Sequence, residues 1–312
     1  MDTKLLEVFL AVVHTGSISA AARRLNFSQP TVSQQMKALE RIMDVQLFTR
    51  EGGRIELTAA GRALQGYAET TLSSWRFVCE QVREAGGRDD LVELSLASFP
   101  SASAALVPEA IAALLAADDR LRVKVLDAEP PASYDLLRSG QVNAIMNFSY
   151  PEDEPTRGQV ELPILDEEFV LLVSENHPLA GEGVVDLEDA AESNWVGGCP
   201  KCRQELITVC RERGFVPEIL CSTDDPTLTR VMVTKGIGVA MRPALSVVGQ
   251  PVPGLVPLSI AHGTRRQVSV VVSDADAEKP EIVALHDALR SAARELVAQS
   301  SPDQQKRIHV AD

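Results

Sequence analysis

The chain has 312 residues, a formal net charge of −14, 45% hydrophobic residues and five cysteines. This length suits about two domains with a buried core, and the acidic balance excludes a protein that binds nucleic acid over its whole surface. No run approaches the roughly 20 apolar residues of a membrane helix, residues 8–13 are too short for a signal peptide, and the scattered cysteines form no disulfide framework. These features predict a protein of the reducing cytoplasm, without a membrane.

The first forty residues are predicted to form three helices. Residues 1–14 have the periodicity of an amphipathic helix, and residues 17–40 hold two short helices joined by a turn at Asn26. Ser28 has the character of an N-cap, and Pro30 suits the first helical turn, where a missing N–H costs nothing.

The last of these helices carries a polar surface. Val32, Met36 and Leu39 share one face, which is therefore predicted to be core. The polar side chains of the other faces are mostly uncharged and can both donate and accept hydrogen bonds, as the reading of base edges requires. Groove contacts are predicted for Gln29, Pro30, Thr31, Ser33 and Gln34, and backbone contacts for Lys37, Arg50 and Arg54.

A hairpin over residues 47–57 completes this module. Its tip is Gly52-Gly53, and the flanking Arg50 and Arg54 suit phosphates or the minor groove. Residues 1–65 hold eight Lys or Arg against six Asp or Glu, a net +2 that leaves −16 for the remainder. A helical hairpin with a solvated polar face is the simpler interpretation, but the added hairpin favours a winged helix-turn-helix that binds DNA.

Residues 1–61 resemble the LysR-type transcriptional regulators. The resemblance rests on LEVFLAVVHTGSISAAARRLNFSQPTVSQQMKALE, then LFTR and LTAAG, with weaker matches at HPLA and KGIGVAMRP further on. It implies a bacterial, cytoplasmic regulator that acts as a homodimer or homotetramer on an interrupted inverted repeat of double-stranded DNA. Family members often carry Arg where this chain has Gln34.

A long helix is predicted to follow, capped by Thr58 and reaching about residue 85. Its apolar positions recur every three or four residues: Leu64, Ala68, Thr71, Trp75, Val78 and Val82. A partner helix from a second subunit would cover this stripe, and packing on the chain's own C-terminal domain is the alternative. The family resemblance favours dimerisation. Residues 86–90 are a predicted hinge.

Beyond residue 90 predicted strands alternate with predicted helices, which predicts parallel α/β structure. The strands include residues 169–174, and the helices include residues 103–117, 187–191 and 280–299. Two α/β lobes joined by crossover strands at residues 162–165 and 255–260 would have the periplasmic-binding-protein architecture, and the family's effector domain is of this type. The predicted domains are a winged helix-turn-helix (1–58), a linker helix (59–88), effector lobe 1 (89–161 and 266–300), effector lobe 2 (162–265) and a disordered tail (301–312).

Ligands of open parallel sheets bind beyond the carboxyl ends of the strands. This rule selects effector-binding candidates in the loops and at the strand ends: Phe99, Pro100, Ser101, Ser103, Glu129, Pro130, Phe148, Trp195, Gly197, Cys199 and Thr223. Glu129 favours a cationic or hydroxylated ligand. Plain helix capping is the alternative for Ser101 and Ser103, and a core position is the alternative for Trp195.

Cys199 and Cys202 form a CxxC motif at the start of a predicted helix. The helix dipole and Lys201 would stabilise a thiolate there, which allows a redox switch. Half a metal site is disfavoured because no second ligand pair has the required spacing. A structural role with one thiol lining the cleft is the preferred interpretation.

The sequence therefore predicts a DNA-binding transcriptional regulator controlled by a small molecule held between two lobes. GxSxG and P-loop motifs are absent, and the histidines have no metal spacing, so no enzyme, metal or cofactor is predicted. A free solute-binding protein is disfavoured by the basic head, and a thiol oxidoreductase rests on Cys199 and Cys202 alone. An effector-independent or redox-sensing DNA-binding regulator remains the alternative.

Overall fold

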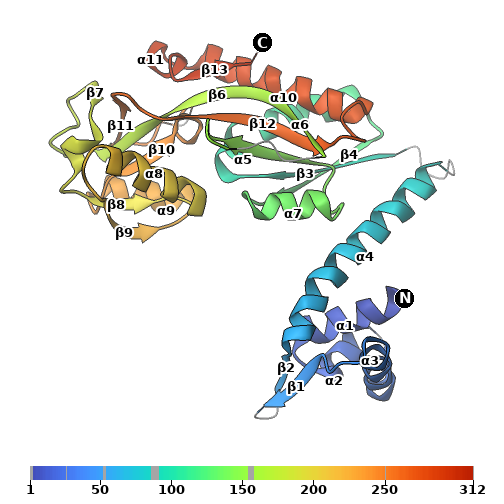
Figure 1. Ribbon diagram of the computed structural model, residues 1–312. Helices are drawn as coiled ribbons and strands as arrows, with labels where there is room; N and C mark the ends of the chain where they lie inside the picture. Colours follow the sequence, from blue (N-terminus) through green and yellow to red (C-terminus); the bar gives the residue numbers. More distant parts are fainter. Residues whose placement is uncertain are drawn as a thin grey trace. The chain divides into compact units, whose positions relative to one another are not determined.

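The computed structural model describes residues 3–25, 27–51, 54–85, 91–153, 158–249 and 251–311. It divides into two compact units, the first comprising Met1–Asp90 with Arg138–Gln141, and the second Leu91–Leu137 with Val142–Asp312. Figure 1 shows a helical N-terminal unit and a larger α/β unit. The predicted turn at Asn26, the tip Gly52-Gly53 and the hinge at residues 86–90 lie outside the described residues.

The N-terminal unit is a winged helix-turn-helix followed by a long helix. Its elements are α1 (Thr3–Thr15), α2 (Ile18–Arg24), α3 (Gln29–Met43), β1 (Phe48–Glu51), β2 (Arg54–Leu57) and α4 (Ala59–Ala85). The predicted caps are confirmed. Ser28 Oγ accepts a hydrogen bond from Thr31 N at 3.3 Å, and Thr58 Oγ1 accepts one from Gly61 N at 3.0 Å. Local capping chemistry therefore sets where α3 and α4 begin.

The wing, residues 47–57 with strands β1 and β2, packs against the helices of this unit. The Phe9 and Phe48 ring centroids lie 5.3 Å apart, and Glu40 Oε1 accepts a hydrogen bond from Leu47 N at 2.9 Å. A Cβ placed on Gly61 would lie 2.2 Å from the Leu47 carbonyl oxygen. Helix α4 therefore approaches the wing this closely only because residue 61 is glycine.

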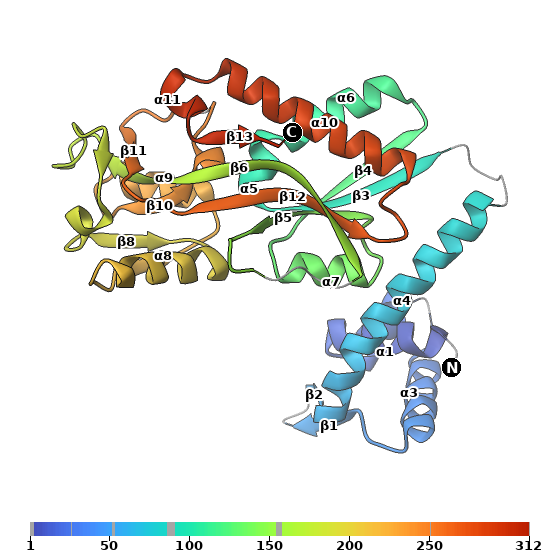
Figure 2. The same cartoon turned by 45° about the horizontal axis from the view of Figure 1, so that its top comes forward.

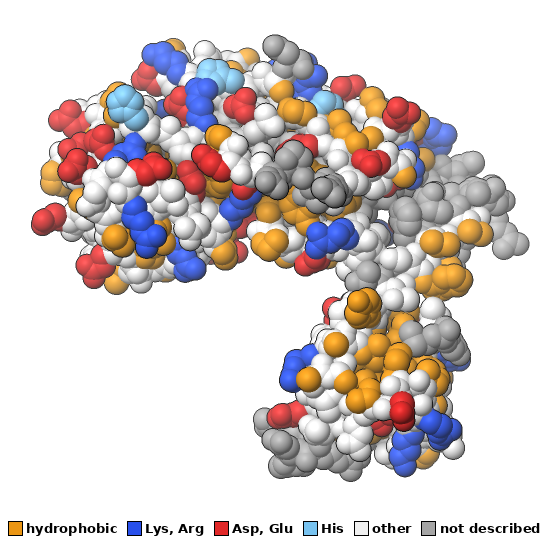
Figure 3. All heavy atoms as spheres, in the orientation of Figure 1, with side chains coloured by type: hydrophobic (Ala, Val, Ile, Leu, Met, Phe, Trp, Pro, Cys, Tyr) orange, Lys and Arg blue, Asp and Glu red, His pale blue; other side chains and the backbone are white. Residues whose placement is uncertain are grey.

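The apolar stripe of α4 has two different surroundings. Ala68 is buried in the core of the N-terminal unit, together with its helical neighbour Leu72. Further along the helix, Trp75, Val78 and Val82 are 52%, 47% and 66% exposed. Figure 3 shows hydrophobic side chains gathered on the visible face of this unit.

One sheet organises the α/β unit. Its strand order is β4-β3-β5-β12-β6-β11-β7, and β10 and β13 also pair with β6. The strands are β3 (Val92–Ser98), β4 (Leu121–Asp127), β5 (Ala144–Ser149), β6 (Gln159–Ser174), β7 (Val184–Val185), β10 (Ala240–Pro243), β11 (Leu255–Ile260), β12 (Arg265–Ser273) and β13 (Ile308–Val310). A separate parallel pair is formed by β8 (Asn194–Gly197) and β9 (Glu218–Ser222).

Helices cover the sheet on both faces, and α10 and α7 lie on opposite sides of it (Figure 1, Figure 2). Strand β5 shows the alternation, since Ala144 and Met146 belong to one buried cluster and Ile145 to another. The helical elements are α5 (Pro100–Ala105), α6 (Val107–Ala117), α7 (Ala132–Arg138), η1 (Leu187–Ala190), α8 (Pro200–Glu212), α9 (Pro226–Thr234), η2 (Ala244–Ser246), α10 (Pro280–Gln299) and α11 (Pro302–Gln305).

Strand β6 joins the two ends of this unit and differs from the prediction. Two short strands were expected at residues 162–165 and 169–174, whereas β6 runs unbroken over 16 residues. The charged residues Asp166, Glu167 and Glu168 do not interrupt it, because each pairs in register with a residue of β12. The predicted division between the lobes at residues 161 and 162 therefore falls inside one strand.

Three further predictions are wrong. The expected helix over residues 103–117 is two helices, α5 and α6, and the expected α-helix near residues 187–191 is the 3-10 turn η1. The tail predicted to be disordered forms α11 and β13, whose residue Ile308 is buried and pairs with Glu167 of β6. Within the part of the chain that the structure describes, no single helix is long and apolar enough to cross a membrane. Among the described helices, only the pair α1 and α2 taken together, bent by 119°, reaches that length and composition.

Candidate functional site

Helix α3 presents the residues predicted to read DNA. Its apolar residues Val32, Met36 and Leu39 are buried, as the periodicity predicts. Of the predicted readers, Gln29, Pro30 and Gln34 are exposed and Thr31 and Ser33 are half-buried, while the predicted anchor Lys37 is exposed. Arg50 lies in β1 and Arg54 in β2, in the two rungs nearest the hairpin tip; their side chains lie outside the described part of the chain.

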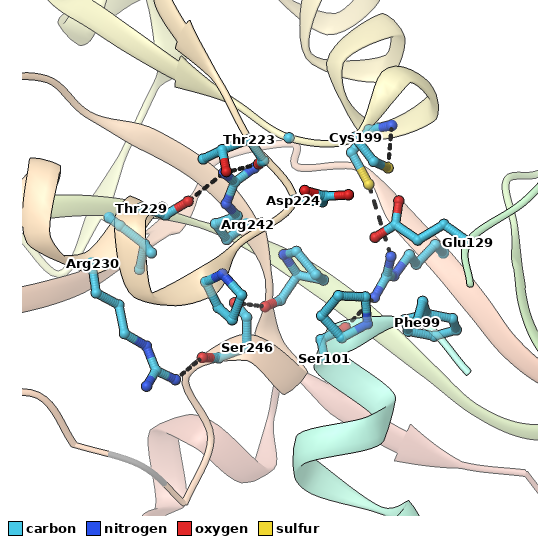
Figure 4. A pocket seen from close by; sticks show the side chains of 17 residues that line it. Phe99, Ser101, Glu129, Cys199, Thr223, Asp224, Thr229, Arg230, Arg242 and Ser246 are labelled. Carbon is cyan, nitrogen blue, oxygen red and sulfur yellow. Dashed lines mark hydrogen bonds between the residues drawn. The ribbon is translucent and has the colours of Figure 1, made fainter. Parts of the chain in front are cut away.

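The α/β unit contains a cavity that is partly open to solvent; its volume, with the solvent-exposed mouth included, is about 550 Å³ (Figure 4). Loops that follow β3, β4, β8 and β9 each contribute to its wall, which is the arrangement that the strand-end rule predicts. The lining residues are Phe99, Pro100, Ser101, Glu129, Leu172, Gly198, Cys199, Cys202, Thr223, Asp224, Pro226, Thr229, Arg230, Arg242, Pro243, Ser246 and Arg266.

The predicted effector-binding residues divide into two groups. Phe99, Pro100, Ser101, Glu129, Cys199 and Thr223 line the cavity, whereas Ser103, Pro130, Phe148, Trp195 and Gly197 do not. Trp195 is fully buried in the core beside Phe215, which confirms the alternative given for it. Phe148 is buried under the guanidinium of Arg266, and the Gly197 carbonyl accepts a hydrogen bond from Arg242.

The capping role considered for Ser101 and Ser103 is wrong. Helix α5 begins at Pro100, and its N-cap, Phe99, makes no side-chain cap hydrogen bond. Proline supplies the first-turn geometry without needing a donor. Ser101 Oγ instead accepts a hydrogen bond from Arg266 Nη2 at 3.0 Å.

Arg266, which sequence reasoning missed, is a buried charge at the cavity. It is 2% exposed, and its Nε donates to Glu167 Oε1 at 2.8 Å. Its guanidinium carbon lies 4.3 Å from the Phe148 ring centroid and 5.0 Å from that of Phe99, which adds cation–π attraction. Glu167 Oε2 also accepts from Leu245 N at 2.7 Å, so the buried pair connects β12, β6 and η2.

Arg242, also missed, is buried with neutral partners. Its Nη2 donates to the carbonyl oxygens of Gly197 and Thr223, and to Thr229 Oγ1 at 2.7 Å (Figure 4). Burial lowers the pKa of this guanidinium from its ordinary value. None of these three acceptors carries charge; the carboxylates of Glu129 and Asp224 lie elsewhere on the wall of the cavity. The signal in the sequence was an arginine inside an otherwise apolar strand, Ala240–Pro243.

The two thiols of the CxxC motif both line the cavity, where the sequence predicted one. Cys199 is the N-cap of α8, and its Sγ accepts from Cys202 N at 3.4 Å. The predicted assistance from Lys201 is wrong, because its Nζ lies 2.5 Å from Asp153 Oδ2 and donates to the Phe148 carbonyl. The cation beside Cys202 is Arg266, whose Nη1 lies 4.0 Å from Sγ.

The ionisation of these groups is shifted by their neighbours. A hydrogen bond from Cys199 and the charge of Arg266 outweigh burial and lower the pKa of Cys202 to about 7. The same hydrogen bond, together with burial, raises the pKa of Cys199. Burial raises the pKa of Glu129, which hydrogen-bonds to the Cys199 thiol. Figure 4 shows Glu129 and Cys199 facing each other at the cavity.

A winged helix-turn-helix joined to an α/β domain with a cavity at its strand ends defines a ligand-responsive transcriptional regulator. Residues 3–62 match the family model described as "Bacterial regulatory helix-turn-helix protein, lysR family", and residues 90–294 match "LysR substrate binding domain". The chain belongs to the LysR family of transcriptional regulators.

Relatives and solved structures agree with this assignment. The chain is 31% identical over 253 residues, 77% of this chain and 82% of the other, to the HTH-type transcriptional regulator ShiR of Corynebacterium glutamicum. It is 30% identical over 245 residues, 76% of each chain, to a probable hydrogen peroxide-inducible genes activator of Mycobacterium leprae. The structure of full-length CbnR complexed with its target DNA is similar with a TM-score of 0.70 and 25% identity, over 94% of this chain and 100% of that one.

Proposed function

We propose that this protein is a cytoplasmic, non-enzymatic regulator in which α3 reads operator DNA and a small molecule in the cavity controls transcription. The observation that carries the proposal is the presence, on one chain, of a helix with an exposed polar face and a cavity lined by charged side chains. The complex of CbnR with its target DNA supports the DNA-binding part.

The proposed DNA contacts fall into two kinds. Gln29, Pro30, Thr31, Ser33 and Gln34 contact base edges in the major groove, because uncharged side chains with donors and acceptors can distinguish base pairs. Lys37, Arg50 and Arg54 contact phosphates, which fix the register of the head without reading sequence. Two heads on a dimer then meet the half-sites of an interrupted inverted repeat, separated by about one helical turn or a multiple of it.

The proposed effector is a small polar molecule with an acidic group. Arg242 supports this because its positive charge is buried among neutral acceptors, so a ligand carboxylate or phosphate beside it would gain a charge-assisted interaction. Glu129 and Asp224 also line the cavity and would accept hydrogen bonds from hydroxyl or amino groups of the same ligand. The proposed ligand therefore carries donors as well as an anionic group.

The test is thermal stabilisation of the full-length chain by a panel of small hydroxy and amino acids and sugar phosphates. A binding acid should raise the melting temperature of the wild type and lose most of this effect in Arg242→Gln. The control Arg211→Gln changes an exposed arginine of α8 and should respond like the wild type. A hit should also change the affinity or footprint on operator DNA. Specific DNA binding that is indifferent to every compound would favour the alternative, an effector-independent regulator.

A further inference from the structure

The thiols of Cys199 and Cys202 both lie at the cavity, in surroundings that favour a reaction between them. Cys199 and Cys202 stand at the N-cap and in the first turn of α8, with Cys202 N donating to Cys199 Sγ at 3.4 Å. Both side chains line the cavity, so a small molecule that enters it meets both sulfur atoms. A disulfide between them closes within one helical turn and needs no movement of a distant segment.

The surroundings distinguish the two sulfur atoms. Cys202 has the buried guanidinium of Arg266 at 4.0 Å. This positive charge favours a thiolate on Cys202. Cys199 is 5% exposed and hydrogen-bonds to Glu129, and both features favour its protonated form. One thiol is thus placed to attack and the other to resolve.

We infer that Cys202 and Cys199 form a redox switch in which a hydroperoxide entering the cavity oxidises Cys202 and Cys199 closes a disulfide. The switch rests on the proposed function. In addition to reversible binding of a small molecule, oxidation of the two thiols would control the same DNA-binding regulator through its cavity. Thiolates with a neighbouring cation and a resolving thiol are the usual targets of hydroperoxides in proteins.

The chemistry balances with the hydroperoxide as the sole oxidant. The Cys202 thiolate attacks the terminal oxygen, the O–O bond breaks, and the leaving oxygen takes a proton from solvent to become water or an alcohol. Cys202 is then a sulfenic acid. Cys199 passes its proton to the carboxylate of Glu129 and attacks Cys202, which forms the S–S bond and breaks the S–O bond. The departing hydroxide takes that proton from Glu129 and leaves as water. The two thiols lose two electrons, which the peroxide bond gains.

The disulfide would alter contacts that connect different elements. It ends the thiolate interaction of Cys202 with Arg266 and the hydrogen bond of Cys199 with Glu129. Arg266 also holds Ser101 of α5 at 3.0 Å and Glu167 of β6 at 2.8 Å. The oxidation state of the pair is therefore transmitted to the wall of the cavity by a buried arginine.

The first test treats the reduced full-length protein with stoichiometric hydrogen peroxide and maps its disulfides by mass spectrometry. In the wild type, Cys199 and Cys202 should be found linked to each other, with the mass lowered by two hydrogens. Cys199→Ser should stop at a sulfenic acid on Cys202 that dimedone traps, and Cys202→Ser should react no faster than free cysteine. The matched control Cys221→Ser should behave as the wild type. A bond that maps to another pair, or undiminished reaction of Cys202→Ser, would overturn the inference.

Alkylation gives a second readout that a structural thiol would not show. The groups that face Cys202 are Cys199, Glu129, Tyr150, Arg242 and Arg266. With these neighbours, iodoacetamide modification of Cys202 in the reduced protein should rise with pH around a midpoint near 7. A midpoint equal to that of an ordinary thiol would contradict the assignment of Cys202 as the attacking group.

The DNA readout separates the failure of this inference from the failure of the proposed function. Reduced protein should bind operator DNA specifically, and oxidation should change its affinity by about tenfold, a common size for allosteric coupling. The double variant Cys199→Ser, Cys202→Ser should bind DNA and ignore peroxide. A disulfide that forms without any change in affinity or footprint would overturn the switch and leave the proposed function standing. Reduced protein without specific binding would instead overturn the proposed function.

Discussion

The buried ion pair between Glu167 and Arg266 gives the sharpest prediction on stability. Replacing Glu167 by Gln preserves the size of the side chain but removes the carboxylate that accepts from Arg266 Nε at 2.8 Å. The glutamate is fully buried and the arginine side chain is 2% exposed, so water cannot take over the lost interaction. A buried guanidinium would then face a neutral amide.

The expected cost follows from this burial. Removing one partner of a buried pair usually destabilises by about 3–5 kcal/mol, because the other charge is left uncompensated. The amide can still accept from Leu245 N, and the aromatic rings beside Arg266 retain their attraction, so we expect about 3 kcal/mol. For a unit of this size that corresponds to a fall in melting temperature of roughly 6–12 °C.

The neighbouring Glu168 supplies the matched control. Its pair with Arg265 is as short, 2.7 Å, but the two side chains are 36% and 49% exposed. Glu168→Gln should therefore cost at most about 1 kcal/mol. Urea unfolding followed by the fluorescence of Trp195, in a Trp75→Phe background, reports on the α/β unit because the chain has two tryptophans. Equal losses for the two variants would refute the reasoning from burial.

Further predictions concern the N-terminal unit. Gly61→Ala places a methyl group 2.2 Å from the Leu47 carbonyl oxygen and should destabilise this unit by about 1–3 kcal/mol in thermal unfolding. Gly66→Ala meets no atom within 4 Å in the same helix and should be stabilising by up to about 1 kcal/mol, so equal behaviour of the two variants would contradict the steric argument. Gln29→Ala should relax discrimination at one base pair by about 1–3 kcal/mol in competition binding. Lys37→Ala should weaken all duplexes alike and reduce the salt slope by about 1, and a change in sequence preference would contradict its role as an anchor.

Local interactions made the structure of the N-terminal unit predictable from the sequence. The burial of Val32, Met36 and Leu39 follows from their spacing, and Ser28 marks the start of α3 through a hydrogen bond to a residue three positions away. Each of these signals lies within one or two helical turns. Helix α10 was predicted to its observed limits, Pro280–Gln299, for the same reason.

The strands of the α/β unit were harder to predict, because residues far apart in the sequence decide where they begin and end. Glu167 suggests a break in a strand until its partner Arg266, from a strand 99 positions later, is known. Strand β13 is only three residues long and exists because β6 offers it an edge. Such pairings leave no periodicity in the sequence.

The cavity was predicted in outline and missed in its charges. The rule that ligands bind at strand ends selected the loops of Phe99, Glu129, Cys199 and Thr223, all of which line it. Its arginines escaped that rule because Arg242 and Arg266 lie within strands and not in the loops that follow them. A charged residue in a buried strand was the signal that should have drawn attention.

Selection of binding sites from a random duplex library tests the central claim most directly. The reduced full-length chain should enrich a sequence with two half-sites in inverted orientation, about one helical turn or a multiple of it apart. Gln29→Ala and Gln34→Ala should each alter the preference at particular base pairs within those half-sites. A library that stays random after repeated rounds, or a preference that neither variant changes, would contradict the assignment of α3 as the reader of DNA.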